Sequence, residues 1–383
     1  MLFTTPSLTT EEESVLQHVE LLRQRLSATT REPRQWVGLL RRVSLARAIQ
    51  GSNSIEGYEV SIEDAMAADD EEEPLRPPDE TWRAILGYRA AMNYVLQLSD
   101  DLHFKLDATL IRSLHYMLQS YDATKRPGRW RLGPIHVQRE ATGEIVYTGP
   151  DPELVPRLVG ELMDAMRGAT GPAVIRAAMA HLNLVMIHPF RDGNGRMARI
   201  LQSLVLTRDG GLTPDFCSID EYLGRNTLSY YDVLREVGQG SWHPDGDARP
   251  WIRFCLTAHY RQARTLLRRT EESELRWNAI ERLVQQRGLP ERSIPALFNA
   301  SMGYRTRNAT YRILAENVSE LVASRDLRSL VDAGLLKPEG AGRGRTYIRT
   351  DELSQVERSI RIDRPQDQAD PFEVAALGRT ATR

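Results

Sequence analysis

Apolar residues recur at intervals of three and four along most of this chain, and that spacing predicts amphipathic helices. Two of the predicted helices begin with proline, at Pro152 and Pro172, where the missing N–H would have no helical partner anyway. The segments with helical spacing are 16–26, 36–49, 80–98, 107–119, 152–166, 172–187, 196–207, 230–237 and 250–268. We therefore expect a mainly α protein with a helical bundle at its centre.

One segment, 133–149, breaks the helical pattern. Its hydrophobic residues alternate on both sides of Thr142 and Gly143, which is the pattern of a short β-hairpin with a tight turn. We expect this to be the one strand pair before residue 260.

A chain of 383 residues is longer than one ordinary core, so several packed units are expected. The acidic run at 69–73 and the prolines after it favour a boundary there, because like charges repel and proline stops helices. The predicted division is an N-terminal helical region at 1–79, a catalytic core at 80–268, a third unit at 269–350 and a loose polar tail at 351–383.

The third unit has the element order of a winged helix: short helices followed by a hairpin near 340–347. Between Glu291 and Arg349, ten Lys and Arg residues outnumber six Asp and Glu residues, an excess that could meet DNA phosphates if it lies on one face. The alternatives are contact with another protein and bracing of the neighbouring unit.

Composition narrows the cellular setting. The formal net charge of -2 gives no global attraction to nucleic acid or to acidic membranes. Cys217 and Cys255 are too few for a disulfide framework and lack the spacing of a zinc site. No apolar run approaches the roughly 20 residues that span a bilayer, and the first residues do not resemble a signal peptide. We expect a cytoplasmic protein without membrane contact.

The segment 188–199, with the sequence HPFRDGNGRMAR, carries the chemistry. Gly193 and Gly195 bracket a turn into a predicted helix, whose free N–H groups and dipole favour a bound phosphate. Arg196 and Arg199 lie three residues apart, so both can reach phosphate oxygens from the first helical turn. These features predict an anion site.

Two more side chains of this segment suit phosphoryl-type transfer. Asp192 offers a hard oxygen for Mg²⁺, which usually binds one or two carboxylates together with phosphates and water. His188 can accept a proton near neutral pH, and a positioned base contributes roughly 10² to 10⁴-fold to rate. A lone histidine or a lone Gly-X-Gly is usually structural, so the prediction depends on their combination.

This segment resembles the signature of the Fic family, His-x-Phe-x-Asp/Glu-Gly-Asn-Gly-Arg-x-x-Arg, at every fixed position, and the resemblance extends over about 40–265. It implies an all-α core with a β-hairpin flap, and transfer of AMP from ATP to a Ser, Thr or Tyr hydroxyl of a target protein. Pyrophosphate would leave, His188 would be the base, Asn194 and Arg196 would complete the catalytic set, and Asp192 would bind Mg²⁺ or Mn²⁺.

The resemblance implies further details of nucleotide binding. Members that phosphorylate alter the second glycine, which is intact here as Gly195, so adenylyl transfer is preferred. Tyr231 and Leu234 would flank the adenine, whereas Gly238 falls where relatives often carry asparagine. A homodimer would also be in keeping with the family. The strand Ile135-His136-Val137 would pair with an extended segment of the target, with an ordinary structural hairpin as the alternative.

Ser52-Asn53-Ser54-Ile55-Glu56-Gly57 resembles the inhibitory motif of the same family, Ser/Thr-x-x-x-Glu-Gly/Asn. A Glu56 carboxylate bound to Arg199 would occupy the guanidinium that must hold the γ-phosphate, so ATP would bind unproductively. Gly57 alone would be read as a helix end. Glu56 could also align water to remove AMP, which would make the enzyme bifunctional. The alternative of another class is a nucleotide-responsive DNA-binding regulator.

Overall fold

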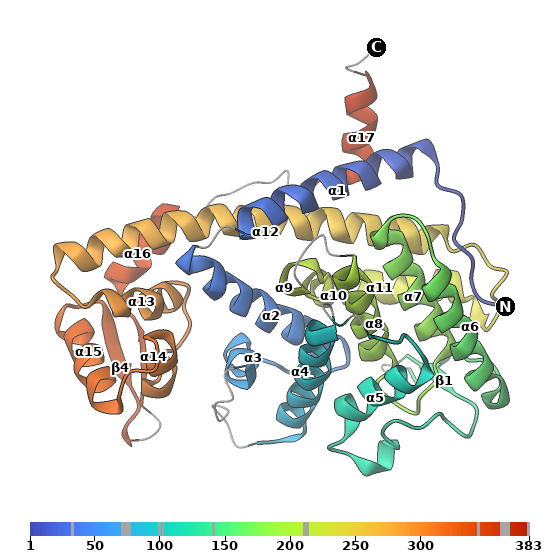
Figure 1. The fold of residues 1–383 in the computed structure, drawn as a ribbon, viewed down its shortest axis with the longest axis horizontal. Helices are drawn as coiled ribbons and strands as arrows, with labels where there is room; N and C mark the ends of the chain where they lie inside the picture. The colour runs from blue at the N-terminus through green and yellow to red at the C-terminus, as the bar shows by residue number, and fades with distance from the viewer. Residues whose placement is uncertain are drawn as a thin grey trace.

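The computed structural model describes residues 1–31, 34–69, 78–98, 101, 103–139, 142–209, 214–342, 345–360 and 368–380, and its fold is mainly α (Figure 1). All of the helices predicted before residue 269 are present, although several are longer than predicted and the last, predicted to end at residue 268, extends to Gln286. The helices of this part are α1 (Thr10–Arg31), α2 (Gln35–Ile55), α3 (Ile62–Asp69), α4 (Glu80–Leu98), α5 (Ala108–Gln119), α6 (Val155–Gly168), α7 (Ala173–Ile187), α8 (Asn194–Arg208), α9 (Pro214–Cys217), α10 (Asp220–Arg225), α11 (Thr227–Gly238) and α12 (Arg249–Gln286).

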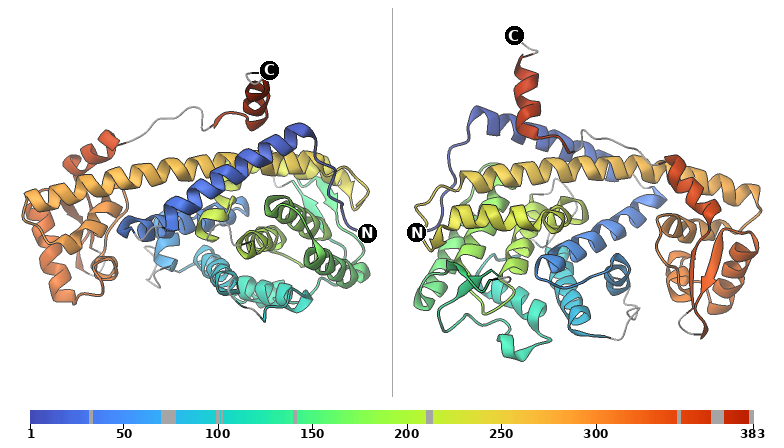
Figure 2. Two further views of the ribbon diagram at one scale, coloured as in Figure 1. Left: turned by 45° about the horizontal axis from the view of Figure 1, so that its top comes forward. Right: turned by 180° about the vertical axis from the view of Figure 1, so that it is seen from behind.

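The longest helix, α12, runs almost the whole length of the molecule, and α1 lies along it (Figures 1 and 2). Glu12 of α1 is fully buried and accepts a 2.6 Å hydrogen bond from Arg249 of α12. The sequence patterns predicted a change of unit after residue 268, but α12 continues unbroken to Gln286. One helix therefore joins the central bundle to the C-terminal unit.

The centre of the bundle is the antiparallel pair α7 and α8, which are linked by the turn at 188–193. Both helices are buried along nearly their whole length, so the turn between them is held from two sides. Helices α4 and α5 pack on α8, α6 packs on α7, and α2 reaches the start of α8 from beside α4 (Figure 1). This packing fixes the loop that was predicted to carry the chemistry.

The predicted hairpin is present, and the structure adds a strand to it. Strand β1 (His136–Gln138) pairs antiparallel with β2 (Ile145–Thr148), which pairs in turn with β3 (Gly240–Ser241) in parallel. Ile135, predicted to be in the first strand, lies just before it, although its carbonyl still accepts a hydrogen bond from Gly149 at 3.1 Å. Strand β3 was not expected because two residues carry no alternation to recognise.

The C-terminal unit has the predicted order of helices and hairpin, but the bounds of its winged-helix assignment stay a prediction. It contains α13 (Ile294–Ser301), α14 (Asn308–Leu314), α15 (Glu320–Asp332) and the antiparallel strands β4 (Leu336–Glu339) and β5 (Thr346–Arg349). Thr306 forms an additional bridge with Tyr347. Two residues of the hairpin predicted near 340–347, Arg343 and Gly344, lie outside the described residues, as do residues 70–77 of the acidic, proline-rich connection.

The expectation of a loose tail after residue 350 was wrong. Helix α16 (Asp351–Ile360) packs on α12 with Leu353 fully buried, and Arg276 of α12 donates a 2.6 Å hydrogen bond to Glu357. Leu353, Val356 and Ile360 have helical spacing, which a mainly polar composition concealed. Helix α17 (Pro371–Thr380) follows, where the Arg253 guanidinium lies 3.8 Å from the ring centroid of Phe372.

Candidate active site

The turn between α7 and α8 is held by its own side chains. The Asn194 amide accepts a hydrogen bond from Phe190 N at 2.8 Å and donates one to Phe190 O at 2.9 Å. The Phe190 ring is fully buried and stacks on His115, with centroids 3.7 Å apart. His115 Nε2 lies 3.0 Å from the carbonyl of Asp192, and its Nδ1 accepts from Gly128 N. These contacts make the loop rigid before any ligand binds.

His188 follows the last residue of α7 in the left-handed conformation, with φ of 51°. Its Nδ1 lies 2.9 Å from the carbonyl of Val185, and because a carbonyl can only accept, Nδ1 carries the proton. The neutral ring therefore keeps Nε2 as a proton acceptor. Burial lowers the pKa of His188, which favours this neutral form. Arg131 fixes the backbone here by donating from Nε to His188 O at 2.9 Å.

The two signature arginines are almost wholly buried at the start of α8, with Arg196 1% and Arg199 0% exposed. Gly193 caps the helix with φ of 76°, and the first N–H groups of a helix have no intrahelical partners. Nε and Nη1 of Arg196 and Nη1 of Arg199 have no hydrogen-bond partner among the described residues. Buried unpartnered guanidinium nitrogens beside a helix N-terminus are what a bound phosphate chain would satisfy.

Asp192 presents a carboxylate next to this entrance. Oδ1 accepts from Gly193 N at 2.7 Å, and Oδ2 lies 2.7 Å from Lys125 Nζ. Burial alone would raise the pKa of Asp192, but the lysine and Arg196 keep it below its ordinary value. In the part of the chain that the structure describes, no group of three or more His, Cys, Asp or Glu side chains could hold a metal ion. A metal here would need most of its ligands from phosphates and water.

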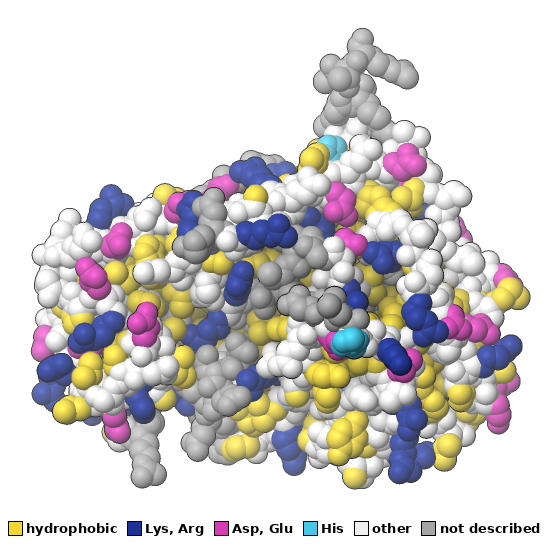
Figure 3. Space-filling model, viewed as in Figure 1, with side chains coloured by type: hydrophobic (Ala, Val, Ile, Leu, Met, Phe, Trp, Pro, Cys, Tyr) yellow, Lys and Arg dark blue, Asp and Glu magenta, His cyan; other side chains and the backbone are white. Residues whose placement is uncertain are grey.

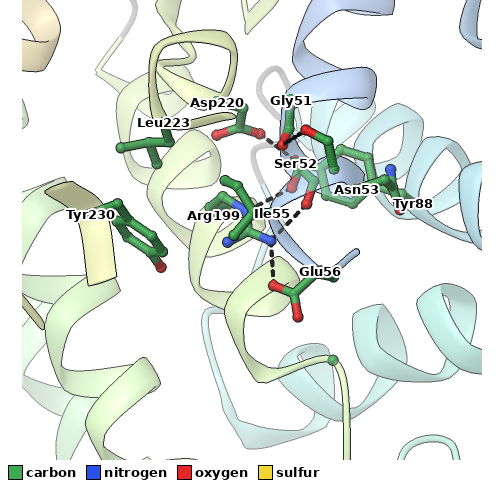
Figure 4. A network of polar contacts seen from close by, with 12 residues as sticks. Gly51, Ser52, Asn53, Ile55, Glu56, Tyr88, Arg199, Asp220, Leu223 and Tyr230 are labelled. Atoms are coloured by element: carbon green, nitrogen blue, oxygen red, sulfur yellow. Dashed lines mark hydrogen bonds and ion pairs between the residues drawn. The ribbon is translucent and has the colours of Figure 1, made fainter. Parts of the chain in front are cut away.

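The segment 52–57, which was predicted to be inhibitory, lies at the end of α2 and contacts Arg199 (Figure 4). Arg199 Nη2 donates to Glu56 Oε1 at 2.7 Å and to Ser52 O at 2.9 Å, while its Nε donates to Ser52 Oγ at 2.7 Å. Burial would lower the pKa of Arg199, but the charge of Glu56 and the acidic groups around it raise it. Gly57 has φ of 83° and ends the helix, whereas the inhibitory role of the motif stays a prediction.

Glycine is required at two places in this arrangement. A Cβ on Gly195 would collide with Glu56 Oε1, so the carboxylate can approach only because residue 195 has no side chain. Gly51 of α2 and Gly224 of α10 face each other, and a Cβ on either would meet the other helix's backbone. The close approach of α2 and α10 therefore fixes the position of Glu56.

The residues predicted to flank adenine lie on α11 beside the inhibitory segment. Tyr231 is 43% exposed, and its hydroxyl donates to the carbonyl of Ile55, the last residue of α2, at 2.8 Å. Leu234 is half-buried and packs on the hydrophobic core. Gly238 is buried, and a Cβ there would lie 3.2 Å from the Tyr147 ring and 3.4 Å from the Met186 side chain. Their contact with a base stays a prediction.

Several residues of this site could not be found from sequence. Lys125 contacts Asp192, Arg131 holds the backbone of His188, and His115 supports Phe190. The Tyr58 ring lies 5.2 Å from the guanidinium carbon of Arg196. All four come from segments far from 188–199 or outside any motif, so only the folded chain brings them together. The one signal was the position of Tyr58, two residues after Glu56.

Comparison with known proteins agrees with this geometry. Residues 105–206 match the model of the Fic/DOC family, so the chain contains a Fic/DOC family domain, which includes the whole segment 188–199. A protein adenylyltransferase, fic-1 of Caenorhabditis elegans, is 28% identical over 174 residues, and the protein adenylyltransferase Fic of Drosophila yakuba is 32% identical over 173. Each alignment covers 44% of this chain and about a third of the relative, 30% and 31% respectively.

Solved structures show that the Fic fold extends over much of the molecule. A Fic family protein from Desulfovibrio desulfuricans superposes with a TM-score of 0.58 over 90% of this chain and 98% of its own, at 18% identity. Fic-1 from Caenorhabditis elegans superposes with a TM-score of 0.53 over 67% of this chain and 72% of its own, at 21% identity. No helix in the described ranges has the length and apolar character needed to cross a membrane.

Proposed function

We propose that this protein transfers AMP from Mg²⁺-ATP to a Ser, Thr or Tyr hydroxyl of a target protein, and that Glu56 restrains the reaction. The observation that carries the proposal is the arrangement of 188–199: a histidine whose Nε2 can accept a proton lies beside a helix N-terminus where Nε and Nη1 of Arg196 and Nη1 of Arg199 are buried without a hydrogen-bond partner among the described residues. The names of the relatives agree with this activity. The chain spans only about a third of their length, so the target is not carried over from them.

His188 supplies the base. The hydrogen bond from Nδ1 to Val185 O fixes both the tautomer and the ring, so Nε2 can take the proton of an incoming hydroxyl. Removal of that proton lets the hydroxyl oxygen attack the α-phosphorus as pyrophosphate leaves. Arg131 and the Asn194 amide act indirectly, because they hold the backbone from which His188 projects.

The phosphate chain would rest on the amide groups opening α8 and on Arg196, with Arg199 reaching the γ-phosphate once Glu56 moves away. The donors fit Mg²⁺, since Asp192 offers one hard carboxylate and the nucleotide would bring further oxygens. Mn²⁺ would fit the same donors. When bound, the metal neutralises charge on the phosphates. Positioning and charge neutralisation are the main needs of such a transfer.

The flap would present the acceptor. Strand β1 lies at the edge of its sheet, and its outer side pairs with no described strand, so an extended segment could add to it. Leu132, a few residues before β1, and Ile145 of β2 are 76% and 52% exposed and would provide apolar contacts for such a segment. The edge recognises the target's backbone, while the choice of side chain depends on the surroundings of His188.

Intact-mass analysis tests the proposal. The Glu56→Gly protein, incubated with ATP, Mg²⁺ and host lysate, should show AMP adducts on itself or on a second protein, and Glu56→Gly with His188→Ala should show none. The matched control is Glu59→Gly, because Glu59 is exposed and has no contact with Arg199. Adducts that persist after His188→Ala would refute the proposed mechanism, and a phosphate-sized adduct would replace AMP transfer by phosphorylation.

A further inference from the structure

Lys125 places a positive charge directly on the carboxylate that would bind the metal. Its Nζ lies 2.7 Å from Asp192 Oδ2, with the two side chains 22% and 35% exposed. Lys125 belongs to the short 3-10 helix η1 (Ala123–Lys125), which is separate in sequence from the signature segment. Because this ion pair is partly exposed, Lys125 can hold the carboxylate in place and can still be replaced there by another cation.

The rest of Asp192 is fixed by neutral donors. Oδ1 accepts from Gly193 N at 2.7 Å, and the carbonyl lies 3.0 Å from His115 Nε2. Oδ2, which Lys125 contacts, is therefore the oxygen left for a cation. An ammonium group and a divalent cation repel each other, so they cannot share this oxygen at contact distance. Binding of a metal at Oδ2 requires Lys125 to leave.

A second acceptor for the lysine lies close by. Glu80 Oε1, at the start of α4, is 3.5 Å from Lys125 Nζ, and its side chain is 56% exposed. The backbone around Lys125 is held: Arg126 N donates to Ala123 O at 3.1 Å, and Thr124 O accepts from Arg191 Nη1 at 3.1 Å. The backbone can thus stay in place while the flexible lysine stem carries the charge from one carboxylate to the other.

We propose that Lys125 is a positioning residue that acts as a built-in counter-cation for Asp192, competes with Mg²⁺ for that carboxylate and moves to Glu80 when metal and nucleotide bind. The inference rests on the proposed function, because it presupposes that Mg²⁺-ATP enters this site. It predicts that the magnesium dependence of nucleotide binding is set by a residue outside the signature segment. It also explains how the loop keeps its shape without a metal.

Calorimetric titration with ATP at a series of Mg²⁺ concentrations tests this. The parent carries Glu56→Gly and His188→Ala, so that the brake and turnover are both removed. Lys125→Met removes the charge and keeps most of the length of the side chain. Added to the parent, it should lower the Mg²⁺ concentration for half-maximal ATP affinity about fivefold, the size expected for one partly exposed ion pair. Lys125→Arg, which keeps the charge, should leave it near the parent value.

Glu80→Gln provides the opposite perturbation. Gln keeps an acceptor oxygen but lacks the negative charge that would draw the ammonium group away from Asp192, so half-maximal ATP affinity should require more Mg²⁺ than in the parent. Thermal unfolding of each variant checks that the fold is intact, and the exposed position of Glu80 makes that variant the safer one to fold.

The outcomes separate the two proposals. If the parent binds no ATP at any Mg²⁺ concentration, the proposed function and this inference both fall. If the parent binds ATP but Lys125→Met needs as much Mg²⁺ or more, only the inference falls. A loss of affinity in Lys125→Met at saturating Mg²⁺ would also overturn it, because Lys125 would then be a ligand of the phosphates.

Discussion

Arg199 of α8 and Glu56, which directly follows α2, are 143 residues apart in sequence. They are joined by a 2.7 Å hydrogen bond at the start of α8. The Arg199 guanidinium is fully buried and also donates twice to Ser52, so three of its hydrogen bonds go to the end of α2. A buried charge that loses a partner is destabilised strongly. Arg199 can therefore release Glu56 at little cost only when another anion, such as a phosphate, takes its place.

Gly195→Ala should disrupt this contact from the opposite side. The added Cβ would occupy the position of Glu56 Oε1, so the carboxylate would have to leave Arg199. We expect the free energy of unfolding to fall by about 1.5 to 3 kcal/mol, the range for a hydrogen bond to a charged group. Chemical denaturation measures it.

The same substitution in Glu56→Gly protein isolates the cause. With the carboxylate absent, Gly195→Ala should cost clearly less, because the remaining close contact is with Arg199 Nη1 at 3.2 Å. Equal losses in the two backgrounds would mean that residue 195 does not act through Glu56.

The pH dependence of AMP transfer should reflect the environment of His188. Its pKa is lowered, chiefly by burial, and a base works in the neutral form. A lowered pKa keeps the imidazole neutral further into the acid range, so kcat/KM of Glu56→Gly protein should fall to half of its plateau only below the ordinary histidine pKa of about 6.5. A half-maximal point above pH 7 would contradict the assignment.

The sequence predicted much of this site because the signature segment is local. His188 and Asp192 lie in the turn between α7 and α8, and Arg196 and Arg199 lie at the start of α8. The relative positions of these four residues therefore follow from the local geometry of the turn and the helix. The inhibitory motif was also predicted, but by resemblance, since nothing in local physics links residue 56 to residue 199. Lys125 was not foreseen, because an ion pair across the fold leaves no pattern in the sequence.

For the fold, too, local features could be predicted from the sequence and long-range packing could not. Amphipathic spacing identified the long helices, whereas α3, α10 and β3 are too short to show a period. The expected boundary at residue 268 lies within one continuous helix, α12, which packs against α1 and α7 and also against α13 and α16. A change of packing partners alters the pattern of apolar residues without ending the helix.

Contact of the C-terminal unit with DNA would depend on few side chains. Of its basic residues, Arg292 pairs with Asp326, Arg305 pairs with Glu339, and Arg312 and Arg349 bond to carbonyls, so their charges serve the fold. In the view of Figure 3, Lys and Arg are interspersed with Asp and Glu on the surface of this C-terminal unit. Arg325 and Arg328 are exposed on α15, the helix that would enter a groove.

We expect duplex binding by this unit only at low salt, and Arg325→Ala with Arg328→Ala should abolish it. Each lost phosphate contact should reduce the slope of log K against log salt by about 0.9. A gel shift across a salt series measures both effects. Lys105→Ala, far from this unit in sequence, is the control, and binding that survives the double substitution would place the contact elsewhere.

Tyr231 couples the predicted adenine pocket to the inhibitory helix. Its hydroxyl donates to the carbonyl of Ile55 at 2.8 Å, next to Glu56, so it satisfies one of the carbonyls that end a helix without partners. Tyr231→Phe removes this bond and keeps the ring. We expect the free energy that holds the end of α2 in its inhibitory position to fall by about 1 kcal/mol, and the rate of AMP transfer to rise about fivefold as a result.

A double-mutant comparison decides whether this effect passes through Glu56. In Glu56→Gly protein the brake is already absent, so Tyr231→Phe should leave kcat unchanged, and any rise in KM would report contact of the hydroxyl with nucleotide. In protein with Glu56 intact, kcat should rise. If Tyr231→Phe changes kcat by the same factor in both backgrounds, the Tyr231 hydroxyl acts on the nucleotide alone. A residue that acts only by holding the end of α2 can have no effect on kcat once the Glu56 carboxylate is absent.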